Sequence, residues 1–126
     1  MANSVTTDIA RHKMAAARAG DIALPAITKM AFGDGGTDAN GDPIAPSGSA
    51  TALNNQLLQQ DVDGHTYPST TTGRYTCTLA KATLGGEKIN EIALVDADGD
   101  LVCIKTFTDK NKDADMGMGF EIDDEF

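Results

Sequence analysis

The chain has 126 residues, of which 10 are basic and 19 acidic, giving a formal net charge of −9. This length is typical of one domain with a core of its own, so we expect a single domain over residues 1–126. An acidic surface repels phosphate backbones, and no apolar run approaches the roughly 20 residues that span a bilayer. Neither a nucleic acid nor a membrane is therefore an expected partner.

A helix is predicted near the start of the chain, over residues 6–17. Thr6 or Thr7 can cap its first turn. Small and apolar residues recur at helical spacing along one face, namely Ile9, Ala10, Met14 and Ala17. Because this face is rich in alanine, we expect the helix to pack closely against a flat surface or against copies of itself.

A short strand and a long loop are predicted after the helix. Residues 27–32 favour a strand, and residues 33–48 are almost all Gly, Asp, Asn, Pro, Ser and Ala, which predicts a loop. A loop of this length in a compact domain is usually functional or mobile. We then predict a second short helix over residues 51–60, with Leu53, Leu57 and Leu58 on its buried face.

The sequence from Arg74 onward indicates β-strands. The alternation of apolar and polar residues after Arg74 predicts one half-buried strand, and residues 88–95 and 101–107 are two more, joined through an Asp-Gly turn that favours a hairpin. We expect the last strand over residues 116–122, followed by a disordered acidic tail at residues 123–126. The expected fold class is α+β, with an N-terminal helix, a second short helix and a small, mostly antiparallel sheet with a C-terminal β-hairpin.

No group of residues in the sequence has the spacing of a catalytic centre or a zinc site. Cys77 and Cys103 are isolated; buried, reduced thiols are the favoured interpretation, and a disulfide between adjacent strands is the alternative. Both histidines also lack a neighbouring catalytic motif. Glu87 and Glu91 would share a face of a strand but lie roughly 13 Å apart, too far to act on one bond. We therefore expect no enzyme activity and no cofactor.

Two acidic loops raise the question of calcium. Asp96, Asp98 and Asp100 have the spacing that opens an EF-hand loop, but the sixth position is Leu101 instead of the required Gly. Because this segment lies between predicted strands, the favoured interpretation is a hairpin turn whose acids face water. The loop over residues 34–42 is also acidic and fits no defined ligand pattern.

Four segments, taken in order, resemble one known family. They are the predicted helix, the segment ITKMAFGDG (27–35), the segment TALNN (51–55) and the segment EIALVDADGDLV (91–102). Together they are similar to the N-terminal domain of phage tail-collar fibre proteins, and the resemblance covers residues 6–107. Asn55 stands where the family usually has an acid, and the family domain normally continues into a long fibre shaft. We expect either a stand-alone tail or baseplate protein related to the fibre head, or a shaft that belongs to another chain. We therefore expect no receptor-binding tip.

The resemblance implies a virion structural protein of a phage, or of a phage-like contractile particle, that attaches or forms the head of a tail fibre at the baseplate. Such a protein would be made in the cytoplasm of the bacterial host and would end up in the virion tail. Its partners would be other tail or baseplate proteins and fibre chains, and it would form a homo-oligomer, with a trimer as the first candidate. The alternative is a free-standing binding module with weak Ca²⁺ sites in the acidic loops.

The candidate assembly contact is the predicted helix together with the strand that follows it. Residues 1–29 carry four basic and two acidic side chains, whereas residues 30–126 carry six basic and 17 acidic ones. The helix could therefore meet the acidic body of a neighbouring subunit. The residues expected to carry this contact are Ile9, Met14, Ala17, Ile27, Met30 and Phe32.

Overall fold

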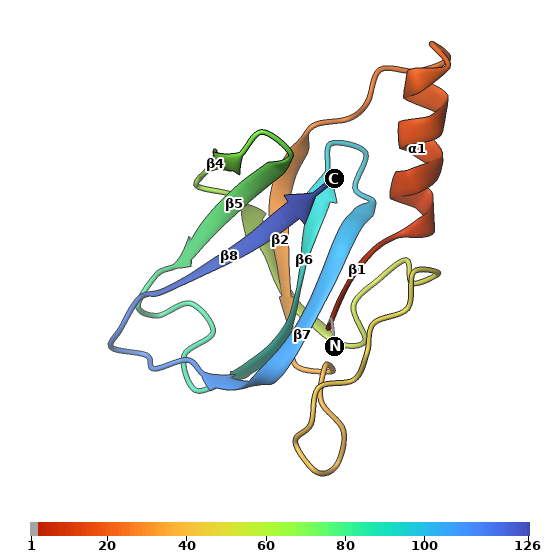
Figure 1. Ribbon diagram of the computed structural model, residues 1–126. Coiled ribbons are helices and arrows are strands. Elements are labelled where there is room, and N and C mark those ends of the chain that lie inside the picture. Colours follow the sequence, from red (N-terminus) through yellow and green to blue (C-terminus); the bar gives the residue numbers. More distant parts are fainter. Residues whose placement is uncertain (1–2) are drawn as a thin grey trace.

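The computed structural model describes residues 3–126, and within them the chain forms one helix and eight strands (Figure 1). In chain order the elements are β1 (Ser4–Thr6), α1 (Asp8–Arg18), β2 (Ile27–Gly33), β3 (Gln56–Asp61), β4 (Gly64–Ser69), β5 (Thr72–Leu79), β6 (Lys88–Asp96), β7 (Leu101–Asn111) and β8 (Met118–Glu125). No helix among these residues has the length and apolar character required to cross a membrane. The fold is mostly β, which corrects the expected α+β class.

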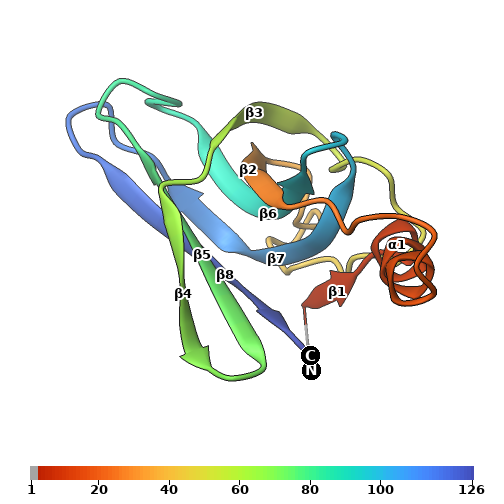
Figure 2. The same ribbon diagram turned by 90° about the horizontal axis from the view of Figure 1, so that it is seen from above.

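The strands form two antiparallel sheets that pack face to face (Figure 2). The larger sheet has the order β1-β7-β6-β2-β3, and the smaller has the order β4-β5-β8. The β6–β7 hairpin predicted from its Asp-Gly turn is confirmed, with Gly99 in the left-handed region at φ 89°. β6 thus lies in the centre of the larger sheet, between β2 and β7.

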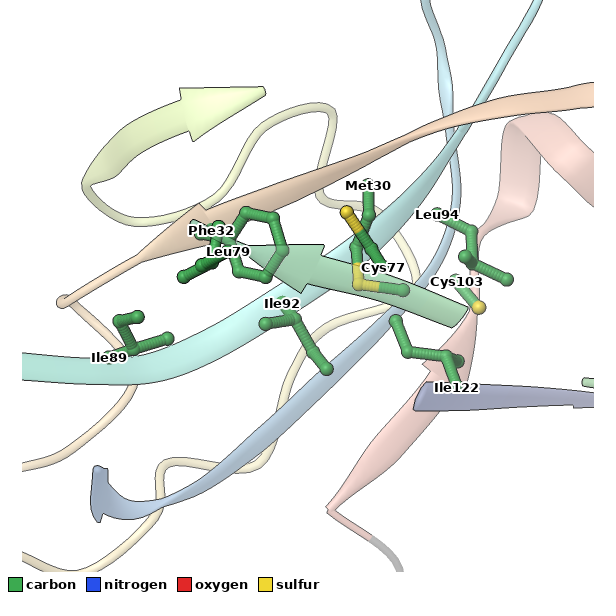
Figure 3. Packing of buried hydrophobic residues seen from close by; sticks show 9 residues of the cluster. All are labelled: Met30, Phe32, Cys77, Leu79, Ile89, Ile92, Leu94, Cys103 and Ile122. Atoms are coloured by element: carbon green, nitrogen blue, oxygen red, sulfur yellow. The ribbon is translucent and has the colours of Figure 1, made fainter. Parts of the chain in front are cut away.

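The main core lies between the two sheets (Figure 3). Phe32 packs edge-on against Phe120, with ring centroids 5.2 Å apart, and so joins β2 to β8. The predicted alternation in β5 is confirmed, because Cys77 and Leu79 are fully buried while Thr78 between them is exposed. The buried members of this cluster are Met30, Phe32, Cys77, Leu79, Ile89, Ile92, Leu94, Cys103 and Ile122.

A second, smaller core covers the outer face of the larger sheet. It contains Ala93 and Val95 of β6, Ile104 of β7 and Leu53 from the segment that precedes β3. A strand with apolar neighbours on both faces is expected to be apolar at consecutive positions instead of alternating. This explains why Ile92, Ala93, Leu94 and Val95 follow one another and are all buried.

The helix α1 is confirmed, and Thr7 fixes its start. The Oγ1 atom of Thr7 accepts a hydrogen bond from the main-chain N–H of Ala10 at 3.2 Å, which is the N-cap arrangement. The same hydroxyl donates to the carbonyl of Leu101 at 2.6 Å. Because Leu101 begins β7, this single threonine both caps the helix and attaches its first turn to the larger sheet.

The prediction of a second helix over residues 51–60 is wrong. Residues 51–55 form turns, and residues 56–61 form the strand β3. Leu58 lies opposite Phe32 in the register of β2 and β3 and packs against the main core, whereas Leu53 precedes β3 and belongs to the smaller core, so the leucines do not share one helical face. Without β3, the main-chain groups along one edge of β2 would have no strand partner, and this tertiary pairing outweighs the helical spacing of the leucines.

The predicted disordered tail is also wrong, because residues 123–125 belong to β8. Asp123 lies opposite Arg74 and Asp124 opposite Gly73 in the register with β5. The guanidinium of Arg74 donates to both carboxylate oxygens of Asp123, at 2.8 and 3.1 Å. The last strand therefore runs three residues beyond its predicted end, and the unpredicted strand β4 completes the smaller sheet.

Candidate functional site

The carboxylate of Glu91 holds two loops against the end of β6. Glu91 is 1% exposed. Its Oε2 atom accepts hydrogen bonds from the main-chain N–H groups of Gly35, at 2.8 Å, and Asn55, at 2.9 Å. Its Oε1 atom accepts from the N–H of Asn54 at 2.9 Å. One buried charge therefore satisfies three main-chain donors that secondary structure leaves without partners.

Three glycines make room for this carboxylate. A Cβ atom on Gly33 would lie 2.5 Å from the carbonyl oxygen of Asn55 and 2.5 Å from Oε2 of Glu91. A Cβ on Gly35 would lie 2.8 Å from the main-chain nitrogen of Asn55, and one on Gly36 would overlap the main-chain carbonyl of Asn90. The three glycines at the end of β2 and just after it are therefore needed for close packing on β6, as glycine permits close approach of backbones.

Asn90 fixes the next part of the same loop. Its Oδ1 atom accepts from the N–H of Gly36 at 2.7 Å, and its Nδ2 group donates to Oγ1 of Thr37 and Oδ1 of Asp109, both at 3.0 Å. The hydrogen bond from Asn90 is the largest of the effects that lower the pKa of Asp109. The predicted loop over residues 33–48 begins one residue later than expected, because Gly33 still belongs to β2, and side chains of β6 and β7 hold the first part of the loop.

We call these residues the Glu91 site; they are Gly33, Gly35, Gly36, Asn54, Asn55, Asn90 and Glu91. The sequence analysis considered Glu91 only as half of a carboxylate pair with Glu87, which is exposed. The available signal was the position of Asn90 and Glu91 inside an otherwise apolar strand. A buried charge in such a strand must be satisfied by hydrogen bonds, which in this protein come from loop main-chain groups.

A second cluster gathers around Lys13. Its Nζ atom lies 2.7 Å from Asp96, 2.8 Å from Asp100 and 3.1 Å from Asp98. Burial alone lowers the pKa of Lys13, but the hydrogen bonds that its ammonium donates to Asp100, Asp96 and Asp98 outweigh this effect and raise the pKa above its ordinary value. The ammonium group joins α1 to the β6–β7 hairpin.

The Lys13 ammonium occupies a position next to the three aspartates that were considered as calcium ligands. One carboxylate oxygen from each of Asp96, Asp98 and Asp100 lies within 4.8 Å of the others, close enough to hold a metal ion. The lysine side chain supplies a positive charge to the same three carboxylates. The expectation that these acids face water is wrong for Asp96, which is buried, and Asp96 also accepts from the N–H groups of Asp98 and Asp100 at 3.0 Å.

The six residues predicted for assembly lie in two different environments. Met30 and Phe32 are fully buried in the core between the sheets, so their side chains are not on the surface. This corrects their place in the predicted contact, because alternation alone did not tell which face of β2 another sheet would cover. The remaining four, which are half-buried, are Ile9, Met14, Ala17 and Ile27.

Both cysteines are free thiols inside the protein. Cys77 and Cys103 are buried and not joined by a disulfide, which confirms the favoured interpretation. Burial raises the pKa of Cys103 to about 12 and also raises that of Cys77. Neither thiol therefore has the lowered pKa of a nucleophile.

The polar groups described above bind the protein's own loops and helix, which is the organisation of a structural domain. The chain belongs to the family described as phage tail-collar fibre protein, N-terminal, whose model matches residues 1–121. This is a family of tail-fibre structural domains and not an enzyme family, and it indicates a location in the virion tail. No curated protein matches the chain, and no solved structure does.

The structure also explains why the segments that carry the family resemblance occur together. Residues 27–35, 51–55 and 91–102 lie far apart in the sequence but contribute Gly35, Asn54, Asn55 and Glu91 to one hydrogen-bonded site. These segments therefore maintain the fold. The side chain of Asn55 takes part as well, because its Nδ2 group donates to Oδ1 of Asp34 at 2.6 Å.

Proposed function

We propose that this protein is a structural component of a phage or phage-like contractile tail, where it attaches a fibre to the baseplate or forms the head of that fibre. The observation that carries the proposal is the exposure of α1 and the segment after it. Of the 11 residues of the helix only Ala10 is buried. In the following segment Ile22 is 43% exposed and Leu24 is 53% exposed. Apolar groups that one chain leaves accessible are typical of a contact surface.

The position of α1 supports this proposal. The helix stands at one side of the two sheets, connected to them through Thr7 and Lys13 (Figure 1). The helix carries three half-buried residues of the predicted contact, Ile9, Met14 and Ala17. The surface beside them has small side chains, because four of the residues from 15 to 19 are alanines. Small side chains let a second helix or a flat partner approach closely. The expected partners are other tail or baseplate proteins, fibre chains and copies of this chain.

The experiment is the molar mass of the purified protein in solution, measured by light scattering behind a sizing column over a range of concentrations. We expect a homo-oligomer, with a trimer as the specific hypothesis for a fibre head. The triple variant Ile9→Asp, Met14→Asp and Ala17→Asp should dissociate it, whereas Ala15→Asp, at an exposed position of the same helix, should leave it intact. Far-UV circular dichroism checks that the variants keep their fold.

Two results would count against self-association through α1. One is a wild-type protein that is monomeric at every concentration, which would leave an adaptor that binds a different tail protein. The other is a triple variant that folds and still assembles. The Ca²⁺-module alternative is disfavoured by Lys13, whose ammonium would have to be displaced from Asp96 and Asp100 by the metal.

A further inference from the structure

The strand β8 has one free edge. It pairs with β5 along its whole length, from Met118 opposite Leu79 to Glu125 opposite Thr72. In the described part of the chain no strand pairs with its other side, because β8 is the last strand of the smaller sheet. β1 is likewise the last strand of the larger sheet, and pairs only with β7. Figure 2 shows the ends of β1 and β8 on the same side of the molecule.

A groove of about 500 Å³ lies between these two edge strands. β8 forms one wall through residues 121–125, β1 forms the other through residues 4–6, and β7 contributes residues 103–105. Arg11 of α1 also borders it. At about 3.3 Å per residue, these walls match an extended segment of roughly four or five residues.

Asp124 borders this groove and has no hydrogen-bond or ion-pair partner among residues 3–126. It is 8% exposed, and it occupies the inward-facing side of β8 together with Ile122, whereas Asp123 and Glu125 face outward. Within residues 3–126 its carboxylate makes no hydrogen bond or salt bridge, unlike the neighbouring Asp123, which binds Arg74. Burial raises the pKa of Asp124. The carboxylate is only partly covered and borders the groove, so a basic side chain of an occupant could reach it.

The charges around the groove favour a cationic occupant. Acidic side chains outnumber basic ones among the residues that border it, which are Arg11, Lys105, Glu121, Asp123, Asp124 and Glu125. Lys13 and Asp96 border a small cavity on the other side of Asp124, but Lys13 is bound to the three hairpin carboxylates. No basic group of the described chain is therefore within salt-bridge distance of Asp124.

We propose that this groove receives an extended segment of a partner protein, which adds a strand to the free edge of β8 and places a Lys or Arg side chain against Asp124. Addition of a strand to an exposed sheet edge is a common mode of peptide recognition, in which main-chain hydrogen bonds supply affinity and side chains supply specificity. Asp124 is the specificity element, because a basic side chain in the groove would form an ion pair with its carboxylate. The inference rests on the proposed assembly role, since the partner would be another tail chain.

The test uses a probe segment attached to the whole protein. A seven-residue peptide of alternating Thr and Val with a central Lys is fused after Phe126 through a flexible Gly-Ser linker, which raises its effective concentration into the millimolar range. A matched fusion has Glu in place of the central Lys. Both are also made with Asp124→Asn, and with Glu125→Gln as a control on the outward face of the same strand.

We expect the Lys fusion to melt about 4 °C or more above the Glu fusion, with amide chemical-shift changes in residues 4–6 and 121–125. The difference should disappear with Asp124→Asn and persist with Glu125→Gln. Equal melting temperatures of the Lys and Glu fusions, or an unchanged difference with Asp124→Asn, would overturn the proposal. Ile9, Met14 and Ala17, which the light-scattering test substitutes, do not border this groove, so failure here leaves that test of the proposed function untouched.

Discussion

Gly33 and Glu91 lie opposite each other on β2 and β6, and the space between them is too small for a side chain. Oε2 of Glu91 would lie 2.5 Å from a Cβ atom on Gly33, while the same oxygen binds the N–H groups of Gly35 and Asn55. The absent side chain of Gly33 and the buried charge of Glu91 are therefore two parts of one arrangement. Both can be tested separately.

Substitution of Glu91 should strongly destabilise the protein. Glu91→Ala leaves three main-chain N–H groups without their acceptor, and we expect the free energy of unfolding to fall by about 3 kcal/mol. The free energy of unfolding of Glu91→Gln should lie between the values of Glu91→Ala and the wild type, because glutamine keeps one acceptor oxygen. Urea denaturation measures both. The control Glu87→Ala, at an exposed position, should change stability by less than about 0.5 kcal/mol.

A methyl group at position 33 should also destabilise the fold. Gly33→Ala forces the main chain of Asn55 or the carboxylate of Glu91 to move, and we expect a loss of about 1–3 kcal/mol in thermal or urea unfolding. Gly64→Ala is the matched control, because no atom lies within 4 Å of its Cβ position and its φ is not positive. That variant should be neutral or slightly stabilising. Equal effects at both positions would contradict the close packing at Gly33.

Lys13 should contribute stability over a defined pH range. Because its pKa is raised in the folded protein, the stability it supplies is fully present below the unfolded value of about 10.5 and is lost as the pH rises through the folded value. We expect Lys13→Met to lower the free energy of unfolding by about 1 kcal/mol between pH 7 and 10. The difference in the free energy of unfolding between wild type and Lys13→Met should become smaller at higher pH. A difference in unfolding free energy that stays constant up to pH 12 would argue against a stabilising contribution from the ion pairs of Lys13.

The same variant tests how the acidic hairpin responds to calcium. In the wild type the Lys13 ammonium lies among Asp96, Asp98 and Asp100, so millimolar Ca²⁺ should leave the melting temperature unchanged. In Lys13→Met the three carboxylates lack this cation, and Ca²⁺ should raise the melting temperature, since a ligand that binds only the folded state stabilises it. Chelation should reverse that rise. Calcium stabilisation of the wild type would instead favour the binding-module alternative.

Neighbouring residues of β8 should respond to pH in opposite directions. The raised pKa of Asp124 means that the folded state holds a proton more tightly than the unfolded state, so stability falls as the pH rises above about 4. Asp124→Asn should therefore stabilise the protein at pH 7 and lose this advantage toward pH 3. The hydrogen bond from Arg74 lowers the pKa of Asp123, so Asp123→Asn should destabilise at pH 7 and become neutral in acid. Melting curves from pH 3 to 8 measure both.

Local sequence signals determined several elements of this protein. The helix follows from the capping position of Thr7 and the spacing of its small residues, and the β6–β7 hairpin follows from its Asp-Gly turn. The strand β5 follows from its alternation. These features depend on interactions within a few residues, which a sequence displays directly.

The tertiary structure decided the features that depend on distant contacts. Residues 51–60 carry leucines at helical spacing, but pairing with β2 makes residues 56–61 a strand. The role of Glu91 requires Gly35, which is 56 residues away, and the cation among the hairpin acids is Lys13, which is 83 residues from Asp96. A charged residue in a sequence does not show which partner will satisfy it. That partner is selected only when the sheets form and exclude water from the charge.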